Sequence, residues 1–197
     1  MYKKVIFIML CLSLSKGQNY KMSPILKSIL VPGWGEKTLQ DNKRSRFFSN
    51  IELSLWTACI GSYTFSYHQM LQYESFAVEH AGILGTEDKN HKYWVDIGNY
   101  IDIDNHNSEH LRWRYLNELY GESEQWSWDT RTNMKKFETM RIRGDYFAKA
   151  GEYILGTIVL NHIVSAIDAL YLLRLKNITF SPIITDEFHS ISLHITF

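Results

Sequence analysis

Residues 153–173 read YILGTIVLNHIVSAIDALYLL, and their composition decides the expected fold. The stretch contains a single formally charged side chain, Asp168. Basic residues border it on both sides, at Lys149, Arg174 and Lys176. A helix that crosses a bilayer needs about 20 consecutive, mostly apolar residues. The length and composition of this stretch therefore predict a membrane-spanning helix.

A second apolar stretch, residues 47–67, reads FFSNIELSLWTACIGSYTFSY. Aromatic side chains occupy both of its ends, which is typical of a membrane helix anchored at the two interfaces. Its one formal charge, Glu52, lies near its start. Together the two stretches predict a mainly α fold built on a two-helix membrane hairpin. The interspersed Asn and Ser residues leave a buried helix of a water-soluble bundle as the alternative for the second stretch.

The N-terminal residues 1–17, MYKKVIFIMLCLSLSKG, have the layout of a secretory signal peptide. Two lysines precede an apolar run that is too short to span a bilayer, and small residues follow it up to Gly17. We expect cleavage after Gly17 and export to the bacterial cell envelope. Because Cys11 would be removed with this segment, the remaining thiol, Cys59, could form no disulfide within the chain. It is predicted to act as a small buried hydrophobe.

Downstream of the signal segment, residues 18–182 are predicted to form one helical, membrane-associated domain with an α-helical polar insertion. The tail, residues 183–197, changes its hydrophobic period from helical to two. Its alternating apolar residues are Ile191, Leu193, Ile195 and Phe197. A period of two is typical of a half-buried strand, so the C-terminus is predicted to form a short β-hairpin.

A short helix and a tight turn are predicted ahead of residues 47–67. Ser23 offers a hydroxyl cap, and Pro24 suits the first position of a helix. The turn that ends this helix consists of Pro32, Gly33, Trp34 and Gly35. Because proline and glycine interrupt a helix, these four residues are assigned a structural role.

Four polar residues of the more apolar stretch are candidates for a binding site. Asn161, Ser165 and Asp168 recur at i, i+4 and i+7 and so share one helical face, with His162 beside them. An Asp at the centre of a membrane helix costs about 2.5–3.5 kcal/mol on insertion scales and needs a partner. Glu52 and Asn50 in the other stretch are candidate partners. The strip could bind an ion or relay protons, but one short strip forms no pore, so hydrogen bonding between helices is favoured.

His106 and His110 are spaced so that both imidazoles could face one side of a helix, with Asp102 and Asp104 upstream. A zinc site usually needs three or four ligands, and HNSEH here does not fit the pattern HExxH. The Asp pair also fails as a calcium loop, because Asn107 stands where glycine is required. Solvated loop histidines are therefore predicted, with a metal site as the lesser alternative. We predict no cofactor and no catalytic residue.

The charge balance argues against one class of partner. The chain has 197 residues, of which 21 are basic and 21 acidic, so its formal net charge is zero. Such a chain lacks the strongly basic surface expected of a nucleic-acid binder. Its six Trp and twelve Tyr combine an apolar body with a polar tip, which suits protein interfaces and membrane interfaces alike.

Three passages together resemble a family of uncharacterised bacterial envelope proteins, classed as a domain of unknown function. The passages are residues 26–35 (LKSILVPGWG), residues 126–143 and residues 161–169 (NHIVSAIDA). Members combine a signal peptide, a Pro-Gly-aromatic-Gly-Gln turn, a two-helix membrane hairpin and an Asp-Ala pair late in the second helix. Glu36 departs from this pattern, because the family has Gln there. The resemblance implies a membrane placement and no known activity.

The sequence therefore predicts a non-catalytic envelope membrane protein that contacts lipid and binds a protein partner or a second copy of itself. One alternative is a membrane protein that handles a small molecule, an ion or a lipid, with or without enzymatic activity, through His106, His110 and Asp168. Another is a water-soluble periplasmic helical domain.

Overall fold

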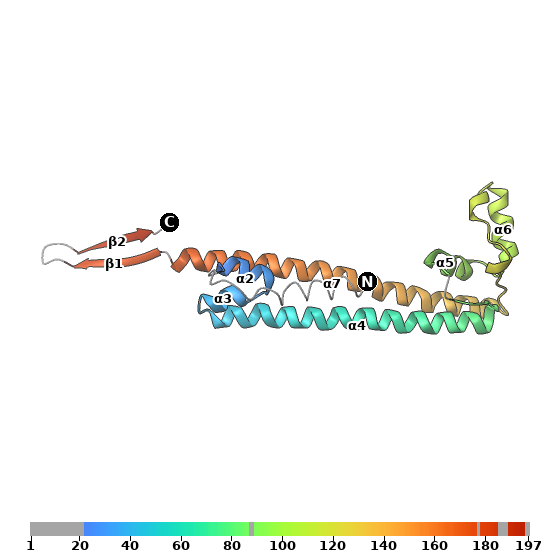
Figure 1. The fold of residues 1–197 in the computed structure, drawn as a ribbon, viewed down its shortest axis with the longest axis horizontal. Coiled ribbons are helices and arrows are strands. Elements are labelled where there is room, and N and C mark those ends of the chain that lie inside the picture. The colour runs from blue at the N-terminus through green and yellow to red at the C-terminus, as the bar shows by residue number, and fades with distance from the viewer. Residues whose placement is uncertain (1–21, 87–88, 177, 185–188, 196–197) are drawn as a thin grey trace. The chain divides into compact units, whose positions relative to one another are not determined.

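The computed structural model describes most of the chain downstream of the predicted signal peptide, which lies outside the described residues. The described residues are 22–86, 89–176, 178–184 and 189–195, with side chains described up to residue 176. This part of the chain is mainly α-helical, as the sequence predicts (Figure 1).

The described residues divide into two compact units. Unit 1 contains residues 22–49 and those from His162 onward, and unit 2 contains residues 50–161. The helices, in chain order, are α2 (Pro24–Leu30), α3 (Trp34–Thr38), α4 (Asn42–Ala81), α5 (His91–Asn99), α6 (Ile103–Arg112) and α7 (Arg131–Lys176), with short 3-10 turns at Leu116–Glu118 and Glu122–Glu124. Helices α4 and α7 each contribute residues to both units.

Unit 1 begins with α2, which starts where the sequence predicts. The backbone N–H of Leu26 donates to the Ser23 hydroxyl at 3.3 Å, and Pro24 occupies the first turn of the helix. This hydroxyl satisfies one of the amides that the first turn of any helix leaves without a partner. Lys27 O closes the other end by accepting from the backbone N–H of Val31 at 2.8 Å.

The turn after α2 is shorter than the sequence predicts. Gly33 has a φ of 93°, in the left-handed region that favours glycine. That conformation lets the chain begin the next helix at once, so Trp34 and Gly35 belong to α3 and not to the turn. Val31 caps the end of α2, and only Pro32 and Gly33 then separate it from the start of α3.

Unit 2 has a core made mostly of aromatic side chains. Its large buried members are Tyr73, Tyr93, Trp94, Ile97, Trp126, Trp128 and Phe137. Several rings meet edge to face, an arrangement that the ring quadrupole favours. Two of the three buried tryptophans donate their indole N–H to backbone carbonyls: Trp126 to Tyr100 O at 3.1 Å and Trp128 to Ile97 O at 2.6 Å.

Within unit 2, α4 and α7 pack through small and polar residues. The Ser62 hydroxyl of α4 donates to Phe147 O of α7 at 2.6 Å. Gly151 lies so near Tyr63 that an added Cβ would stand 2.9 Å from the ring. Cys59 is 3% exposed and has no disulfide, which confirms the prediction of a small buried hydrophobe.

Two strands follow α7. Strand β1 (Ile178–Ile184) pairs antiparallel with β2 (His189–Ile195), with Ile178 opposite Ile195 and Ile184 opposite His189. They form a two-stranded sheet.

Among the described residues, one helix is long and apolar enough to cross a membrane by length and composition. This helix is α7, in which an 18-residue window reaches a mean hydropathy of 1.6. Only 28% of that window is buried, so most of its apolar residues are not covered by the chain itself. Residues 47–67 are helical within α4 but do not reach the same hydropathy.

Candidate functional site

A fully buried carboxylate lies at the centre of unit 1. Glu36, in α3, is 0% exposed. Its Oε2 accepts from the Ser28 hydroxyl at 2.6 Å, and its Oε1 accepts from the Ser165 hydroxyl at 2.7 Å. Both serines are also fully buried. A buried carboxylate needs hydrogen-bond donors, and here two hydroxyl groups supply them.

Two glycine amides complete this arrangement. Gly35 N donates to Ser28 Oγ at 3.0 Å, and Gly33 N donates to Ser165 Oγ at 2.9 Å. Each serine hydroxyl therefore accepts a hydrogen bond from a backbone amide and donates one to the Glu36 carboxylate. A side chain at Gly35 would collide with the Pro24 carbonyl and the Ser28 hydroxyl, so only glycine fits there. The cluster fastens α2 and α3 to the part of α7 that carries Ser165.

Asp168 has a basic partner that the sequence analysis did not identify. The guanidinium of Arg44 pairs with Asp168 Oδ1, and Arg44 also contacts Asp41 at 3.3 Å. The prediction that Glu52 serves as the partner is therefore wrong, because α4 presents an arginine to Asp168. The second oxygen, Oδ2, is buried and has no hydrogen-bond partner among the described residues.

The other predicted residues form separate contacts. In unit 1, His162 Nδ1 lies 2.6 Å from Ile29 O, and because a carbonyl only accepts, this nitrogen carries the proton. In unit 2, Asn161 Nδ2 donates to Glu52 Oε2 at 2.9 Å, and the Trp56 indole donates to Glu52 Oε1 at 2.7 Å. The polar strip thus serves several hydrogen bonds and is not gathered around one ligand position.

Around these polar contacts, α7 is apolar on its outer surface. Asn161 and Ser165 are 8% and 0% exposed. The neighbouring large apolar residues are between 50% and 61% exposed: Val159, Leu160, Ile163, Val164, Ile167 and Tyr171. Helix α4 repeats this inversion, since Ser45 and Ser62 are buried while Leu53 and Ile60 are 70% and 63% exposed.

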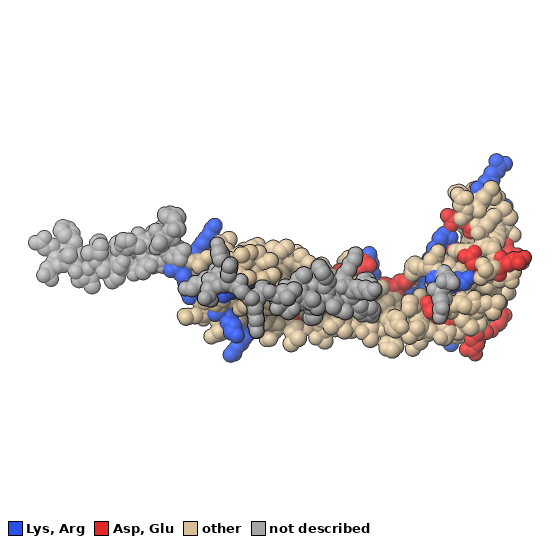
Figure 2. All heavy atoms as spheres, in the orientation of Figure 1, with Lys and Arg blue, Asp and Glu red and all other residues tan. Residues whose placement is uncertain are grey.

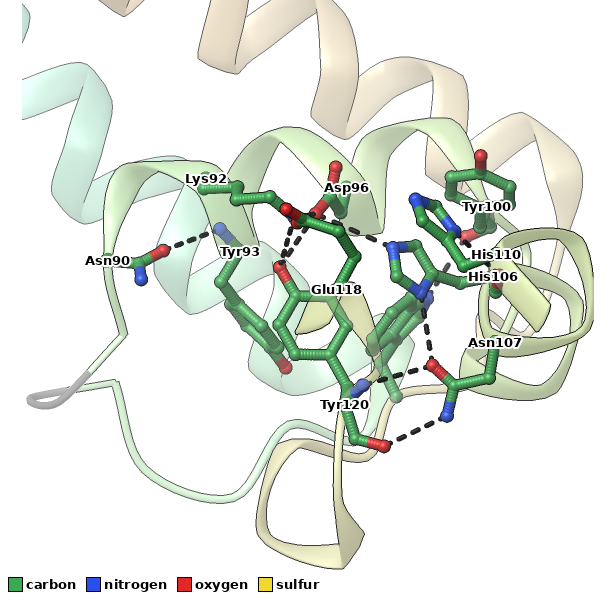
Figure 3. A network of polar contacts seen from close by, with 11 residues as sticks. Asn90, Lys92, Tyr93, Asp96, Tyr100, His106, Asn107, His110, Glu118 and Tyr120 are labelled. Atoms are coloured by element: carbon green, nitrogen blue, oxygen red, sulfur yellow. Dashed lines mark hydrogen bonds and ion pairs between the residues drawn. The ribbon is translucent and has the colours of Figure 1, made fainter. Parts of the chain in front are cut away.

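His106 and His110 lie in a helix of unit 2, so the prediction that they are solvated loop residues is wrong. His106 is 0% exposed and lies in α6, stacked on His110 with ring centroids 4.0 Å apart (Figure 3). The prediction fails because Asp102 caps α6, accepting from Asn105 N at 2.7 Å, so the helix begins before His106 and turns it inward. Burial lowers the pKa of His106, which favours the neutral ring.

Asn107 sets which nitrogen of His106 carries the proton. Its amide donates to Tyr120 O at 2.9 Å and its Oδ1 accepts from Tyr120 N at 3.1 Å, which fixes the amide orientation. The same Oδ1 lies 3.2 Å from His106 Nδ1, which must therefore donate. In the neutral ring, Nε2 then keeps a lone pair, 3.6 Å from Asp96 Oδ2 and without a hydrogen-bond partner in the described structure.

Asp96 joins this histidine to a closed network (Figure 3). Its Oδ2 accepts from Lys92 at 2.6 Å and from the Tyr120 hydroxyl at 2.7 Å, while Lys92 also pairs with Glu118 at 2.8 Å. Burial, together with the Asp96 carboxylate, raises the pKa of Tyr120, so its phenol stays protonated and donates. Every charged member already has a partner, which suits a structural network better than a catalytic one.

The predicted metal alternative gains no third ligand. Within the residues that the structure describes, no group of three or more His, Cys, Asp or Glu side chains could hold a metal ion. Sequence analysis also missed Glu36 and Arg44. The signals for Glu36 were its place after the Pro-Gly-Trp-Gly turn and its departure from the Gln of the resembled family, and nothing in the spacing of Arg44 pointed to Asp168.

Comparison with known proteins identifies no relative. No family model matches the chain, and no curated protein and no solved structure matches it.

Proposed function

We propose that this chain is a non-catalytic membrane protein of the bacterial cell envelope, held in the bilayer by the apolar stretches of α7 and α4. The observation that carries the proposal is the inverted polarity of α7: Asn161 and Ser165 are buried, whereas Ile163 and Ile167 are 50% and 61% exposed. In water, polar groups would face outward and large apolar side chains inward.

Lipid accounts for this inversion. A bilayer core offers no hydrogen bonds, so the polar groups of a membrane helix must pair inside the protein. The contacts of Ser165 with Glu36 and of Asn161 with Glu52 meet that requirement. Helices that pack in lipid also use small residues and hydroxyl groups at their interfaces, as Gly151 and Ser62 do here.

The second stretch, within α4, completes a membrane hairpin in this proposal. It is less apolar than α7, but its outward residues include Leu53, Trp56 and Ile60, and its buried residues include Ser45 and Ser62. The resemblance to the uncharacterised envelope family supports the same placement. In this proposal the two strands after α7, together with unit 2, contact a protein partner.

The role proposed for unit 2 is binding and not catalysis. Charged side chains gather over α5 and α6 on the face that Figure 2 shows. Asp96, Lys92, Tyr120 and Glu118 are bonded to one another, so these four groups near His106 are already engaged. Such a unit is suited to lie in water and to contact a partner.

Labelling of introduced cysteines tests the placement. Ile163 and Leu111 are almost equally exposed, at 50% and 52%, and lie on α7 and α6. In a chain with Cys11 and Cys59 replaced by Ser, we expect a membrane-impermeant maleimide to label Leu111→Cys in opened membrane vesicles. Ile163→Cys should react only after the membrane is dissolved and the protein denatured. Equal labelling of the two positions in intact membranes would refute the proposal.

A further inference from the structure

A hollow of about 320 Å³ lies at the end of α6 in unit 2, lined by Tyr100, Glu109, His110, Trp113 and Tyr115. We propose that it binds the methylated ammonium group of a small organic cation. The site is formed by unit 2 alone and does not depend on the membrane placement proposed above.

The end of α6 brings two aromatic rings to the hollow. Arg114 adopts a φ of 58°, and the helix closes with Arg114 N donating to Leu111 O at 3.1 Å and Tyr115 N donating to His110 O at 2.9 Å. These two hydrogen bonds form a Schellman motif, in which the residue after the C-cap adopts a left-handed backbone conformation. Glycine usually occupies that position. Here Arg114 reverses the chain between Trp113 and Tyr115, and both of these side chains line the same hollow.

The lining has the chemistry of a cation site. Three aromatic side chains, Tyr100, Trp113 and Tyr115, line the hollow together with the Glu109 carboxylate, and neither Lys nor Arg is among its lining residues. A cation within about 6 Å of a ring centroid is attracted to the ring face, most strongly for Trp. Trp113 and Tyr115 are 68% and 59% exposed, so they are not needed to fill the core of unit 2.

The back of the hollow is held rigidly. His110 stacks on the buried His106, and its Nδ1 donates to His106 O at 2.9 Å. Tyr100 packs against His106 with ring centroids 4.8 Å apart, and burial together with the Glu109 carboxylate raises the pKa of its hydroxyl (Figure 3 shows the two histidines and Tyr100). Preformed walls of this kind reduce the ordering cost of binding.

The hollow has more aromatic rings than charged hydrogen-bond acceptors, and this favours a methylated ammonium group over a primary one. A primary ammonium group carries three N–H donors, each of which needs an acceptor when it leaves water. Among the residues that line the hollow, Glu109 alone supplies a charged acceptor. A trimethylammonium group has no donor to satisfy and gains from ring faces and from the charge of Glu109 together.

The test is a titration with choline, using the full chain in an uncharged maltoside detergent. Saturation-transfer NMR follows the choline methyl protons, and the neutral isostere 3,3-dimethylbutan-1-ol is titrated in parallel. We expect saturable choline binding and at least about 10-fold weaker binding of the isostere, because cation–π attraction requires the charge. Saturable binding of both compounds with equal affinity, or no binding of choline, would overturn the proposal.

Variants assign the binding to the hollow. Trp113→Leu and Glu109→Gln should each weaken choline binding about 10-fold, and Trp113→Phe should lose less because a ring remains. Leu116→Ala is the matched control, since Leu116 is 65% exposed and does not line the hollow. Near-ultraviolet circular dichroism confirms that each variant keeps its aromatic core. Unchanged binding in both Trp113→Leu and Glu109→Gln would overturn the assignment.

A second arm identifies the source of the ammonium group. Nanodiscs of phosphatidylcholine are compared with nanodiscs of phosphatidylglycerol as competitors of choline. Displacement by phosphatidylcholine alone would assign the site to a lipid headgroup, and retention of choline in both would assign it to a free cation. Equal displacement by both lipids would overturn the requirement for an ammonium group.

Discussion

The apolar stretch of α7 and the helix α5 are both amphipathic, but in opposite senses. In α5, Tyr93, Trp94 and Ile97 are buried while His91 and Lys92 are exposed. In α7, the serine at position 165 is buried, and the large aliphatic side chains around it point outward. The same chain therefore contains one helix with the polarity expected in water and one stretch with the polarity that the proposed membrane placement requires. What differs is which face the neighbouring elements cover.

The comparison also shows how each region is stabilised. Unit 2 relies on large aromatic rings in mutual contact, which are stabilised by removal from water. The interior of unit 1 is built from short hydrogen bonds among Glu36, Ser28 and Ser165 and from the pair Arg44–Asp168. Removal of a ring should therefore harm unit 2, and removal of a hydroxyl should harm unit 1.

Truncation of a core ring should have the largest effect. Phe137 is 0% exposed and contacts the rings of Tyr73 and Trp128 at centroid distances of 5.5 and 5.1 Å. We expect Phe137→Ala to destabilise unit 2 by about 3–5 kcal/mol, through lost burial and the cavity left behind. Thermal unfolding in detergent, followed by near-ultraviolet circular dichroism, measures the change. The control Ile163→Ala, on the outer face of α7, should change stability by about 0.5 kcal/mol or less. Equal losses in both would remove the contrast between the regions.

A charge on the outer face of α7 should have the next largest effect. Ile163 lies at the middle of residues 153–173, and an Arg at the centre of a membrane helix costs about 2.5–3.5 kcal/mol on insertion scales. We expect Ile163→Arg to lower the amount of membrane-inserted protein roughly 100-fold at equilibrium. Leu111→Arg, at nearly the same exposure in α6, should leave that amount unchanged. Quantitative immunoblotting of washed membranes measures both variants. Normal insertion of Ile163→Arg would indicate that α7 faces water.

Local sequence signals predicted the helical elements, and the limits of that prediction are physical. The cap at Ser23 and the apolar periods of residues 47–67 and 153–173 depend on neighbours along the chain, so the helices could be placed. The contacts of Glu36 and Arg44 with their serine and aspartate partners depend on residues from other helices.

Spacing shows which residues share a helical face, but it does not show which face is covered. Ser165 and Asp168 were placed on one face correctly, yet their partners, Glu36 and Arg44, come from positions more than a hundred residues away. His106 was misjudged for a related reason. A histidine in a polar segment gives no local sign of burial. The burial of His106 depends on the cap at Asp102, which starts α6 ahead of this histidine.

Loss of one hydroxyl should weaken unit 1 by a smaller amount. Ser165→Ala leaves the Gly33 amide without its acceptor and Glu36 Oε1 without its donor. An unsatisfied buried polar group costs about 1–3 kcal/mol, so we expect a loss in that range. Thermal unfolding in detergent and abundance in membranes report it. Thr157→Ala is the matched control, because this hydroxyl is exposed and bonds only to Tyr153 O of its own helix. If both variants behaved alike, the buried cluster would contribute no stability.

Acid should destabilise unit 2 through His106. Burial lowers the pKa of His106, and the positive charges of His110 and Lys92 lower it further. The hydrogen bond to Asn107 and the carboxylate of Asp96 oppose this shift in part. Because the unfolded chain binds this proton near pH 6.5 and the folded chain only at lower pH, stability is present above pH 6.5 and is lost as the pH falls. One proton contributes a slope of at most about 1.4 kcal/mol per pH unit.

The pH effect is separated from other titrations by comparing two variants. His106→Phe removes the proton-binding group while keeping a ring, so unit 2 of this variant should lose less stability between pH 7 and pH 5 than the wild type does. His68→Phe, which replaces an exposed histidine of α4, should keep the wild-type slope. Urea unfolding at several pH values, followed by tryptophan fluorescence, measures all three proteins. A wild-type slope that His106→Phe leaves unchanged would show that the Asp96 carboxylate compensates the burial of the imidazole in full, and that acid acts on unit 2 through other groups.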